Sequence, residues 1–387
     1  WLVIAGLFFK IINMNNLLKY IFVIVVVVFL FSCRKEGCTD PTAPNYNASA
    51  KVDDGSCICT SSSGPTPYTL QVPPIFARLL PAPIIPVDNP MTVEGVLLGK
   101  KLFFDKKLSG DNTLSCSGCH LPQNSFDDTS RFSIGIDGIR GTRNAMPIFN
   151  VAWNTVDIYF WDGRANGLEE QALGPVENPI EMHESWGNAV AKLQADSDYP
   201  TLFKQAFGTS TIDSVLVAKA IAQYERTLIS GNSRYDKFLM RTQSLTPQEL
   251  NGYQIFIDES KGDCFHCHGD ATNPKWTDNI FHNNGLDSVF TDNGLGDITG
   301  DPNDNGKFKT PSLRNLKYTA PYMHDGRFKT LEEVIDHYSQ GLHDSPTIDP
   351  LMKKVASGGV RLTILEKSDL KAFLLSLTDE DFILKHQ

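Results

Sequence analysis

Cys116-Ser-Gly-Cys-His120 and Cys264-Phe-His-Cys-His268 are the two stretches that decide how this chain is organised. Each reads C-x-x-C-H, the attachment signature of a c-type haem. In such a motif the two cysteines bind the porphyrin edge through thioether bonds, and the histidine binds the iron. A structural zinc site, which also uses C-x-x-C pairs, is the alternative. Zinc does not require a histidine directly after the second cysteine, whereas this chain has one twice, so the pattern favours two haems.

The length and charge of the chain limit the classes of function. Its 387 residues are enough for two domains, each with its own core. The formal net charge is −10, and no run of basic residues is present. This argues against a nucleic-acid partner.

Residues 1–32 have the pattern of a signal peptide of the lipoprotein type. An apolar run from Ile21 to Leu30 follows Lys19 and is short for a membrane span. Leu30-Phe-Ser-Cys33 resembles a bacterial lipobox, which implies cleavage before Cys33 and acylation of its thiol. We therefore expect an exported protein, lipid-anchored on the periplasmic side or cell surface of a bacterial membrane.

Residues 33–60 form a small acidic segment that contains cysteines. The stretch between Cys38 and Cys57 looks like a disulfide-closed motif of surface proteins, so we expect a Cys38–Cys57 bridge and an unpaired Cys59. Asp53-Asp54-Gly55 is typical of a turn, with calcium binding as the alternative.

From Thr92 onward the sequence repeats itself loosely. The stretch from Gly99 to Asp105 precedes the first haem motif, and that from Gly252 to Asp258 precedes the second. After the haem motifs, Trp161 to Glu170 matches His324 to Glu333 position for position in spacing. The repeat indicates two units of similar construction.

Helix signals complete each unit. Thr246 as N-cap, Pro247 and Glu249 predict the start of a helix before the second haem motif. Amphipathic helices are expected over Val215–Ile229 and Thr363–Leu377, one closing each unit. A helix, a C-x-x-C-H motif, a ligand loop and a closing helix are the outline of a cytochrome c domain.

These observations predict a mainly α fold with long loops. It consists of two tandem cytochrome c-like domains, residues 92–240 and 241–387, each binding one covalent c-type haem. Residues 61–91 are rich in proline and predict a semi-rigid tether between the membrane and this body.

Further motifs occur in a characteristic order over residues 92–380. They resemble those of the bacterial di-haem cytochrome c peroxidases and the related MauG-type enzymes, and include Phe160-Trp-Asp-Gly-Arg164, Gly174-Pro-Val-Glu-Asn-Pro-Ile-Glu-Met182 and Thr319-Ala-Pro-Tyr-Met-His-Asp-Gly326. The resemblance implies that the N-terminal haem reduces hydrogen peroxide. It implies that the C-terminal haem relays electrons from a donor cytochrome c or small copper protein, and that homodimers are common.

The resemblance assigns catalytic roles to three side chains. Glu181 matches the distal glutamate, which can take a proton from one peroxide oxygen and deliver it to the other. Gln171 matches a distal glutamine that assists by hydrogen bonding, and Trp161 matches the tryptophan between the haems. Without the motifs, Glu181 would read as a solvated carboxylate and Trp161 as a core residue.

The resemblance also implies one calcium ion between the haems. Asn144 matches its side-chain ligand, and Thr319 and Pro321 match ligands that act through their backbone carbonyls. Oxygen atoms of this kind suit a hard cation.

The first departure from the family pattern concerns the N-terminal haem. In peroxidases that need reductive activation, a histidine in an Ile-Gly-His context blocks the iron. Here the matching run is Ser133-Ile-Gly-Ile136, and Ile136 cannot ligate. We therefore expect an N-terminal iron that is open without prior reduction.

The second departure concerns the C-terminal haem. The position of the family's axial methionine is Tyr338, as in the MauG-type enzymes, where tyrosine ligates. Met323 and His337 are the alternatives, with Met323 second. The matching position of the first repeat is Pro175, which offers no ligating atom.

Three functions follow from these features. The first is a cytochrome c peroxidase that reduces hydrogen peroxide to water. The second is a MauG-like oxidase that acts on a protein or small-molecule substrate. The third is a non-catalytic di-haem electron carrier, against which Glu181, Gln171 and the open side at Ile136 and Pro175 argue.

Overall fold

The computed structural model describes residues 35–41, 43, 45–57 and 64–387. The chain divides into two compact units, Trp1–Gly64 and Pro65–Gln387. The expected signal peptide (1–32), the lipidation site Cys33 and the unpaired Cys59 lie outside the described residues. Among the residues that are described, no helix is long and apolar enough to cross a membrane.

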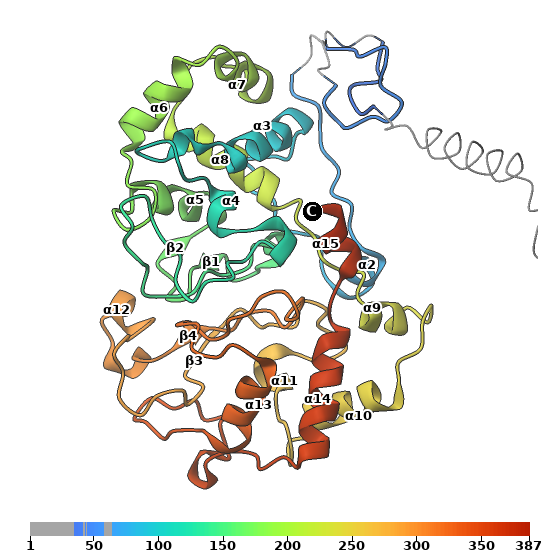
Figure 1. Cartoon of the computed structure of the whole chain (residues 1–387), viewed down its shortest axis with the longest axis vertical. Coiled ribbons are helices and arrows are strands. Elements are labelled where there is room, and N and C mark those ends of the chain that lie inside the picture. The colour runs from blue at the N-terminus through green and yellow to red at the C-terminus, as the bar shows by residue number, and fades with distance from the viewer. Residues whose placement is uncertain (1–34, 42, 44, 58–63) are drawn as a thin grey trace, which may run out of the picture. The chain divides into compact units, whose positions relative to one another are not determined.

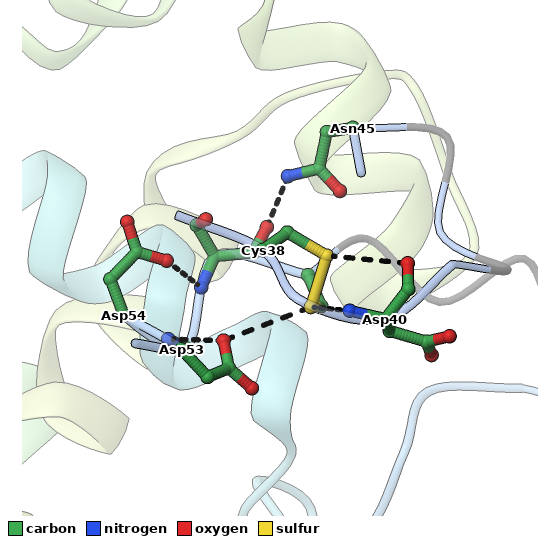
Figure 2. The surroundings of a disulfide bond; sticks show 8 residues. Cys38, Asp40, Asn45, Asp53 and Asp54 are labelled. Atoms are coloured by element: carbon green, nitrogen blue, oxygen red, sulfur yellow. Dashed lines mark hydrogen bonds between the residues drawn. A yellow bond between two sulfur atoms is a disulfide. The ribbon is translucent and has the colours of Figure 1, made fainter. Parts of the chain in front are cut away.

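The described part of the smaller unit is built around the disulfide between Cys38 and Cys57, which confirms the predicted bridge (Figure 2). The backbone N–H of Gly55 donates to Asp53 Oδ1 at 3.0 Å, and that of Ser56 donates to Asp54 Oδ1 at 2.9 Å. These are the side-chain-to-backbone bonds of Asx turns, so the turn interpretation of this stretch holds.

The larger unit is mainly helical, as predicted, and its strands are only two residues long (Figure 1). Its α-helices are α2 (Pro74–Leu79), α3 (Val93–Phe104), α4 (Cys116–Cys119), α5 (Leu168–Glu177), α6 (Trp186–Gln194), α7 (Tyr199–Phe207), α8 (Ser214–Glu225), α9 (Arg234–Leu239), α10 (Pro247–Ile257), α11 (Phe265–His268), α12 (Gly296–Thr299), α13 (Leu331–Gln340), α14 (Ile364–Ser376) and α15 (Glu380–Lys385). Two antiparallel ladders pair β1 (Ile158–Tyr159) with β2 (Ala165–Asn166) and β3 (Phe281–His282) with β4 (Phe308–Lys309).

The same helix pair occurs in both halves of the repeat. Helix α3 packs on α8, and α10 packs on α14 (Figure 1). A Cβ atom on Gly99 of α3 would lie 1.8 Å from the carbonyl oxygen of Ala220, and one on Gly252 of α10 would lie 2.0 Å from that of Asp369. Each crossing therefore requires a glycine at the matching position, because the two backbones touch there.

Helix boundaries follow the predicted capping signals. The capping boxes of Thr246 with Glu249 and of Thr363 with Glu366 are both present, at the starts of α10 and α14. Helix α8 ends at Glu225, four residues before the predicted boundary. The cause is a tight turn in which the backbone N–H and the hydroxyl of Thr227 both donate to Tyr224 O.

Two large hydrophobic clusters form the cores of the halves. The first is built on α3, α5, α6, α7 and α8, and the second on α10, α13 and α14. Phe382 and Ile383 of α15 belong to the first cluster although they end the chain. Both halves fall within one compact unit, residues 65–387, and the predicted boundary at 240/241 lies inside it.

Residues 65–91 belong to the folded body, where the sequence indicated a tether. Ile75 and Phe76 of α2 are buried against Trp153, whose indole N–H donates to Pro81 O at 3.1 Å. The rings of Phe76 and Trp153 meet edge to face with centroids 5.0 Å apart. Proline composition indicated an extended segment, but these apolar side chains dock it on the body.

A buried ion pair joins Asp236 of α9 to Arg314, 78 residues further along the chain. Arg314 is fully buried, and its guanidinium donates to both carboxylate oxygens of Asp236 at 2.7 and 2.8 Å. The Asp236 carboxylate also accepts from the backbone and hydroxyl of Ser233 in the capping box of α9. Burial raises the pKa of Asp236, but the charge of Arg314 outweighs this effect and holds the pKa below its ordinary value.

We expect Asp236→Ala to lower the free energy of unfolding of the holoprotein by about 3–5 kcal/mol, because it leaves the Arg314 charge buried without a partner. Lys317→Ala is the control, since Lys317 and Glu380 form an ion pair with both side chains half exposed, and it should cost less than about 1 kcal/mol. Chemical denaturation followed by tryptophan fluorescence compares the two. Equal costs would contradict a structural role for the buried pair.

Candidate active site

The first C-x-x-C-H motif forms one wall of a cavity of about 440 Å³. Helix α4 carries Cys116 and Cys119, whose thiols are free, and His120 follows as its C-cap. The His120 ring has Nδ1 3.1 Å from Phe126 O. Burial lowers the pKa of His120, so the ring is neutral and oriented through Nδ1. Nε2 is then available for a metal.

The second motif borders a smaller cavity of about 220 Å³. Cys264 and Cys267 are free thiols, and His268 ends α11. Burial lowers the pKa of His268 to about 4, so its imidazole is neutral. Within the described part of the chain, Nδ1 of this ring has no hydrogen-bond partner. A neutral imidazole beside two thiols fits the covalent attachment and proximal ligation of a haem.

The zinc alternative finds little support in this arrangement. Among the described residues, Cys267, Asp278 and His282 are the one group of three potential ligands close enough to share an ion. Of the two motifs it includes a single cysteine, whereas structural zinc sites gather four ligands. His282 is already paired with Asp278 at 2.9 Å and also with Asp349.

Glu181 lies on the wall of the first cavity, as does His120. Its Oε1 accepts a hydrogen bond of 2.6 Å from the Asn178 amide, and its backbone carbonyl accepts from Ile136 N at 3.0 Å. Burial raises the pKa of the Glu181 carboxyl, although the Arg164 charge and the Asn178 hydrogen bond lower it. A positioned carboxyl with a raised pKa is a stronger base than an ordinary carboxylate, which suits proton exchange with a substrate.

Helix α5 places Gln171 and Pro175 on the same cavity. Met146 and Tyr159 also border this cavity and have atoms that could bind a metal. The backbone of Met146 faces His120, and the hydroxyl of Tyr159 lies 3.5 Å from Val151 O. Pro175 itself borders the cavity with a ring that has no atom able to bind a metal.

The Ser133–Ile136 stretch packs against the Glu181 loop. A Cβ atom on Gly135 would lie 2.3 Å from Ile180 O, so only glycine allows this approach. Ile134 and Gly135 border the cavity, while the Ile136 side chain lies near Gly110. Among the described residues that line the cavity, His120 is the only histidine.

Trp161 borders both cavities. Its indole N–H donates to Asn144 O at 2.8 Å, and its carbonyl accepts from Lys309 N at 2.9 Å. Asn144 and Lys309 also line both cavities, so these three residues form part of a shared wall. We use this name for the residues that border both cavities.

Tyr338 and Met323 both line the second cavity. The Tyr338 hydroxyl accepts a hydrogen bond of 3.1 Å from the side-chain amide of Asn284, and Met323 Sδ lies 3.6 Å from the same nitrogen. His337 is engaged elsewhere, with Nε2 3.3 Å from Asn284 O. Burial raises the pKa of Tyr338 to about 12.

Helices α5 and α13 reproduce the repeat in space. Each has ten residues, and Pro175 and Tyr338 both stand at the eighth position. The first borders the larger cavity and the second the smaller one. Pro175 and Tyr338, which match in the sequence repeat, thus occupy equivalent places beside the two cavities, but only Tyr338 has an atom that could bind a metal.

The three residues matched to calcium ligands also come together. Asn144, Thr319 and Pro321 all line the second cavity. The Asn144 amide nitrogen donates to Ser130 O at 3.1 Å, which fixes the side chain.

Several residues of these cavities escaped the sequence reasoning. Lys309 is buried, burial lowers its pKa to about 8, and its ammonium lies 5.1 Å from the Tyr159 ring centre. Glu225 lines the first cavity, and burial raises its pKa to about 8. No local sequence pattern identifies Lys309, Glu225 or Asn284 as a residue of these cavities. Arg164 had a signal, because Asp-Gly-Arg occurs in both repeats.

Comparison with known proteins agrees with this geometry. The sequence profile of the family described as "Di-haem cytochrome c peroxidase" matches residues 93–244. The methylamine utilization protein MauG of Methylophilus methylotrophus is 34% identical over 322 residues, which cover 83% of this chain and 93% of that protein. Cytochrome-c peroxidase IdrP1 of Pseudomonas sp. (strain SCT) is 33% identical over 344 residues, covering 80% and 87%.

A solved structure shares the fold. It is that of a MauG-like protein associated with microbial copper homeostasis, with a TM-score of 0.73 and 39% identity, covering 82% of this chain and 97% of that one. The chain therefore belongs to the di-haem cytochrome c peroxidase family, which includes the MauG proteins and consists of haem oxidoreductases with two c-type haems.

Proposed function

We propose that this protein reduces hydrogen peroxide to water with electrons from a c-type cytochrome or a small copper protein. The observation that carries the proposal is the content of the first cavity. It brings the half-buried carboxyl of Glu181 and the imidazole of His120 to one space, with Pro175 where the second cavity has Tyr338. A pure electron carrier has no use for such a site.

The residues that would hold the cofactors follow from the two motifs. Cys116, Cys119 and His120 would bind one haem, and a second would be bound by Cys264, Cys267 and His268. When bound, the first haem supplies an iron at which peroxide is reduced, and the second supplies electrons to it.

The chain itself handles the protons. The Glu181 carboxylate accepts a proton from one peroxide oxygen and delivers it to the other, which leaves as water. The whole reaction consumes one peroxide, two electrons and two protons and yields two waters. Asn178 keeps the carboxylate in place through Oε1, and Gln171 provides an amide on the same cavity.

Electrons would pass through the shared wall. Trp161 borders both cavities, and its hydrogen bonds at the indole nitrogen and the carbonyl fix it there. A fixed aromatic side chain between two redox centres shortens the distance that an electron must tunnel outside bonded atoms.

Tyr338 is the sixth ligand that we propose for the C-terminal haem, with Met323 as the alternative. Its place on the second cavity and its match to Pro175 support this choice. An anionic oxygen ligand lowers the reduction potential, whereas methionine raises it.

Other parts of the proposal rest on the sequence resemblance. They are a calcium ion at Asn144, Thr319 and Pro321, a lipid anchor at Cys33 on an exported protein, and a homodimer. Asn144, Thr319 and Pro321 all line one cavity, which supports the proposal of a calcium site there.

A MauG-like oxidase is the second candidate function. It is favoured by the tyrosine at position 338 and by the identity of 34% to a MauG protein. Steady-state oxidation of reduced cytochrome c by peroxide separates the candidates. Rapid turnover supports the peroxidase, and negligible turnover with intact haem spectra would favour the oxidase or a carrier.

We expect Glu181→Gln to lower kcat/KM for peroxide by roughly 100- to 10,000-fold, because the amide cannot accept the proton. In the unchanged protein, activity should fall as the pH drops through the raised pKa of Glu181, since the protonated carboxyl is no base; the variant should lack this limb. Glu177→Gln, an exposed carboxylate four residues away, is the control. Equal activity of the two variants would refute the role of Glu181.

The ligand assignments predict the spectrum of the oxidised protein. Electron paramagnetic resonance should show one high-spin haem, from the open N-terminal site, and one low-spin haem. Tyr338→Phe should abolish the native low-spin signal, that of the tyrosine-ligated haem, and Met323→Leu should preserve it. The opposite pattern would establish Met323 as the ligand, and two low-spin signals in the unchanged protein would contradict the open first site.

A further inference from the structure

Asn284 lies between the two candidate ligands of the second cavity. Its side-chain nitrogen donates to Tyr338 Oη at 3.1 Å and lies 3.6 Å from Met323 Sδ. All three side chains line the same cavity. One amide group, with two N–H donors, therefore contacts both atoms that compete for one coordination position.

The main chain on either side of Asn284 is held firmly. The Asn283 amide donates to Ser345 Oγ and Thr347 Oγ1, both at 2.9 Å. Gly285 N donates to Asn283 Oδ1 at 3.0 Å. The amide of Asn284 is thus presented from a fixed segment directly after β3 (Phe281–His282).

A further contact fixes this segment to the helix that carries Tyr338. His337 Nε2, one residue before Tyr338 on α13, lies 3.3 Å from Asn284 O. The His337 and Tyr338 rings are 5.0 Å apart. Backbone and side chain of Asn284 therefore contact adjacent residues of α13, which sets the distance between the amide and Tyr338 Oη.

The two acceptors differ greatly in strength. A phenolate oxygen is a strong acceptor that can bind a metal and accept an N–H at the same time, whereas a thioether sulfur is a weak one. A donor at this position stabilises the anionic oxygen far more than the sulfur.

We propose that Asn284 is a positioning residue that makes Tyr338, and not Met323, the ligand of the C-terminal haem iron. This inference rests on the proposed function, because it takes Tyr338 as the ligand. Asn284 touches neither peroxide nor the first cavity, and it acts through the oxygen of Tyr338.

The test replaces the amide in the full-length holoprotein. Asn284→Leu, of similar size, removes the donor. We expect the ratio of tyrosine-ligated to methionine-ligated protein to fall by roughly ten- to a hundredfold, the effect of losing one hydrogen bond to a charged oxygen. Near-infrared magnetic circular dichroism distinguishes the two ligands, and electron paramagnetic resonance gives the spin state.

Two further variants separate ligand choice from folding. Asn284→Asp keeps the shape but replaces the donor with an acceptor, and it should shift the ligand in the same direction if the leucine variant folds poorly. Ser345→Ala loosens the segment through Asn283 while leaving the amide at 284, and it should keep the tyrosine signature.

The outcomes are distinct. A tyrosine signature that persists in both the Asn284→Leu and Asn284→Asp proteins overturns the inference while leaving Tyr338 as the ligand. A methionine signature in the unchanged protein instead refutes the ligand assignment itself.

Discussion

The hydrogen bonds of the shared wall are the constraint on which the rest of the structure depends. The Trp161 indole N–H binds Asn144 O within the first half, and the Trp161 carbonyl accepts from Lys309 of the second half. Asn144 N in turn donates to His324 O at 2.7 Å. Since these bonds cross between the halves, the two cavities cannot move apart without breaking them. A reaction that needs two haems in fixed relation requires such a wall.

Around this wall, a symmetric framework carries asymmetric chemistry. The glycines at the two helix crossings, Gly99 and Gly252, meet backbone in the same way. Helices α5 and α13 have equal length, yet the same helical position is Pro175 in one and Tyr338 in the other. Duplication thus accounts for the two haem motifs, and substitution at single positions of the repeat gives the two cavities different chemistry.

The sequence predicted what is local or repeated, and missed what depends on distant contacts. Capping boxes, the disulfide and the haem motifs are signals within a few residues or at a known spacing, and the structure contains them. The docking of Phe76 on Trp153 and the return of Phe382 to the first core join segments far apart in the chain. Asn284 carries no signal of its own, because its role appears only where a loop meets a helix 54 residues later.

Under the proposed ligand assignment, the second cavity is where a peroxidase and an oxidase would differ. The roles proposed for Glu181 and for an open N-terminal haem suit both candidate functions, so the first cavity does not distinguish them. The difference that we propose between them lies in the reduction potential of the C-terminal haem. That potential follows the sixth ligand and the hydrogen bonds to it. In this chain those features would come from the proposed ligand Tyr338, its alternative Met323 and the amide of Asn284, which contacts both.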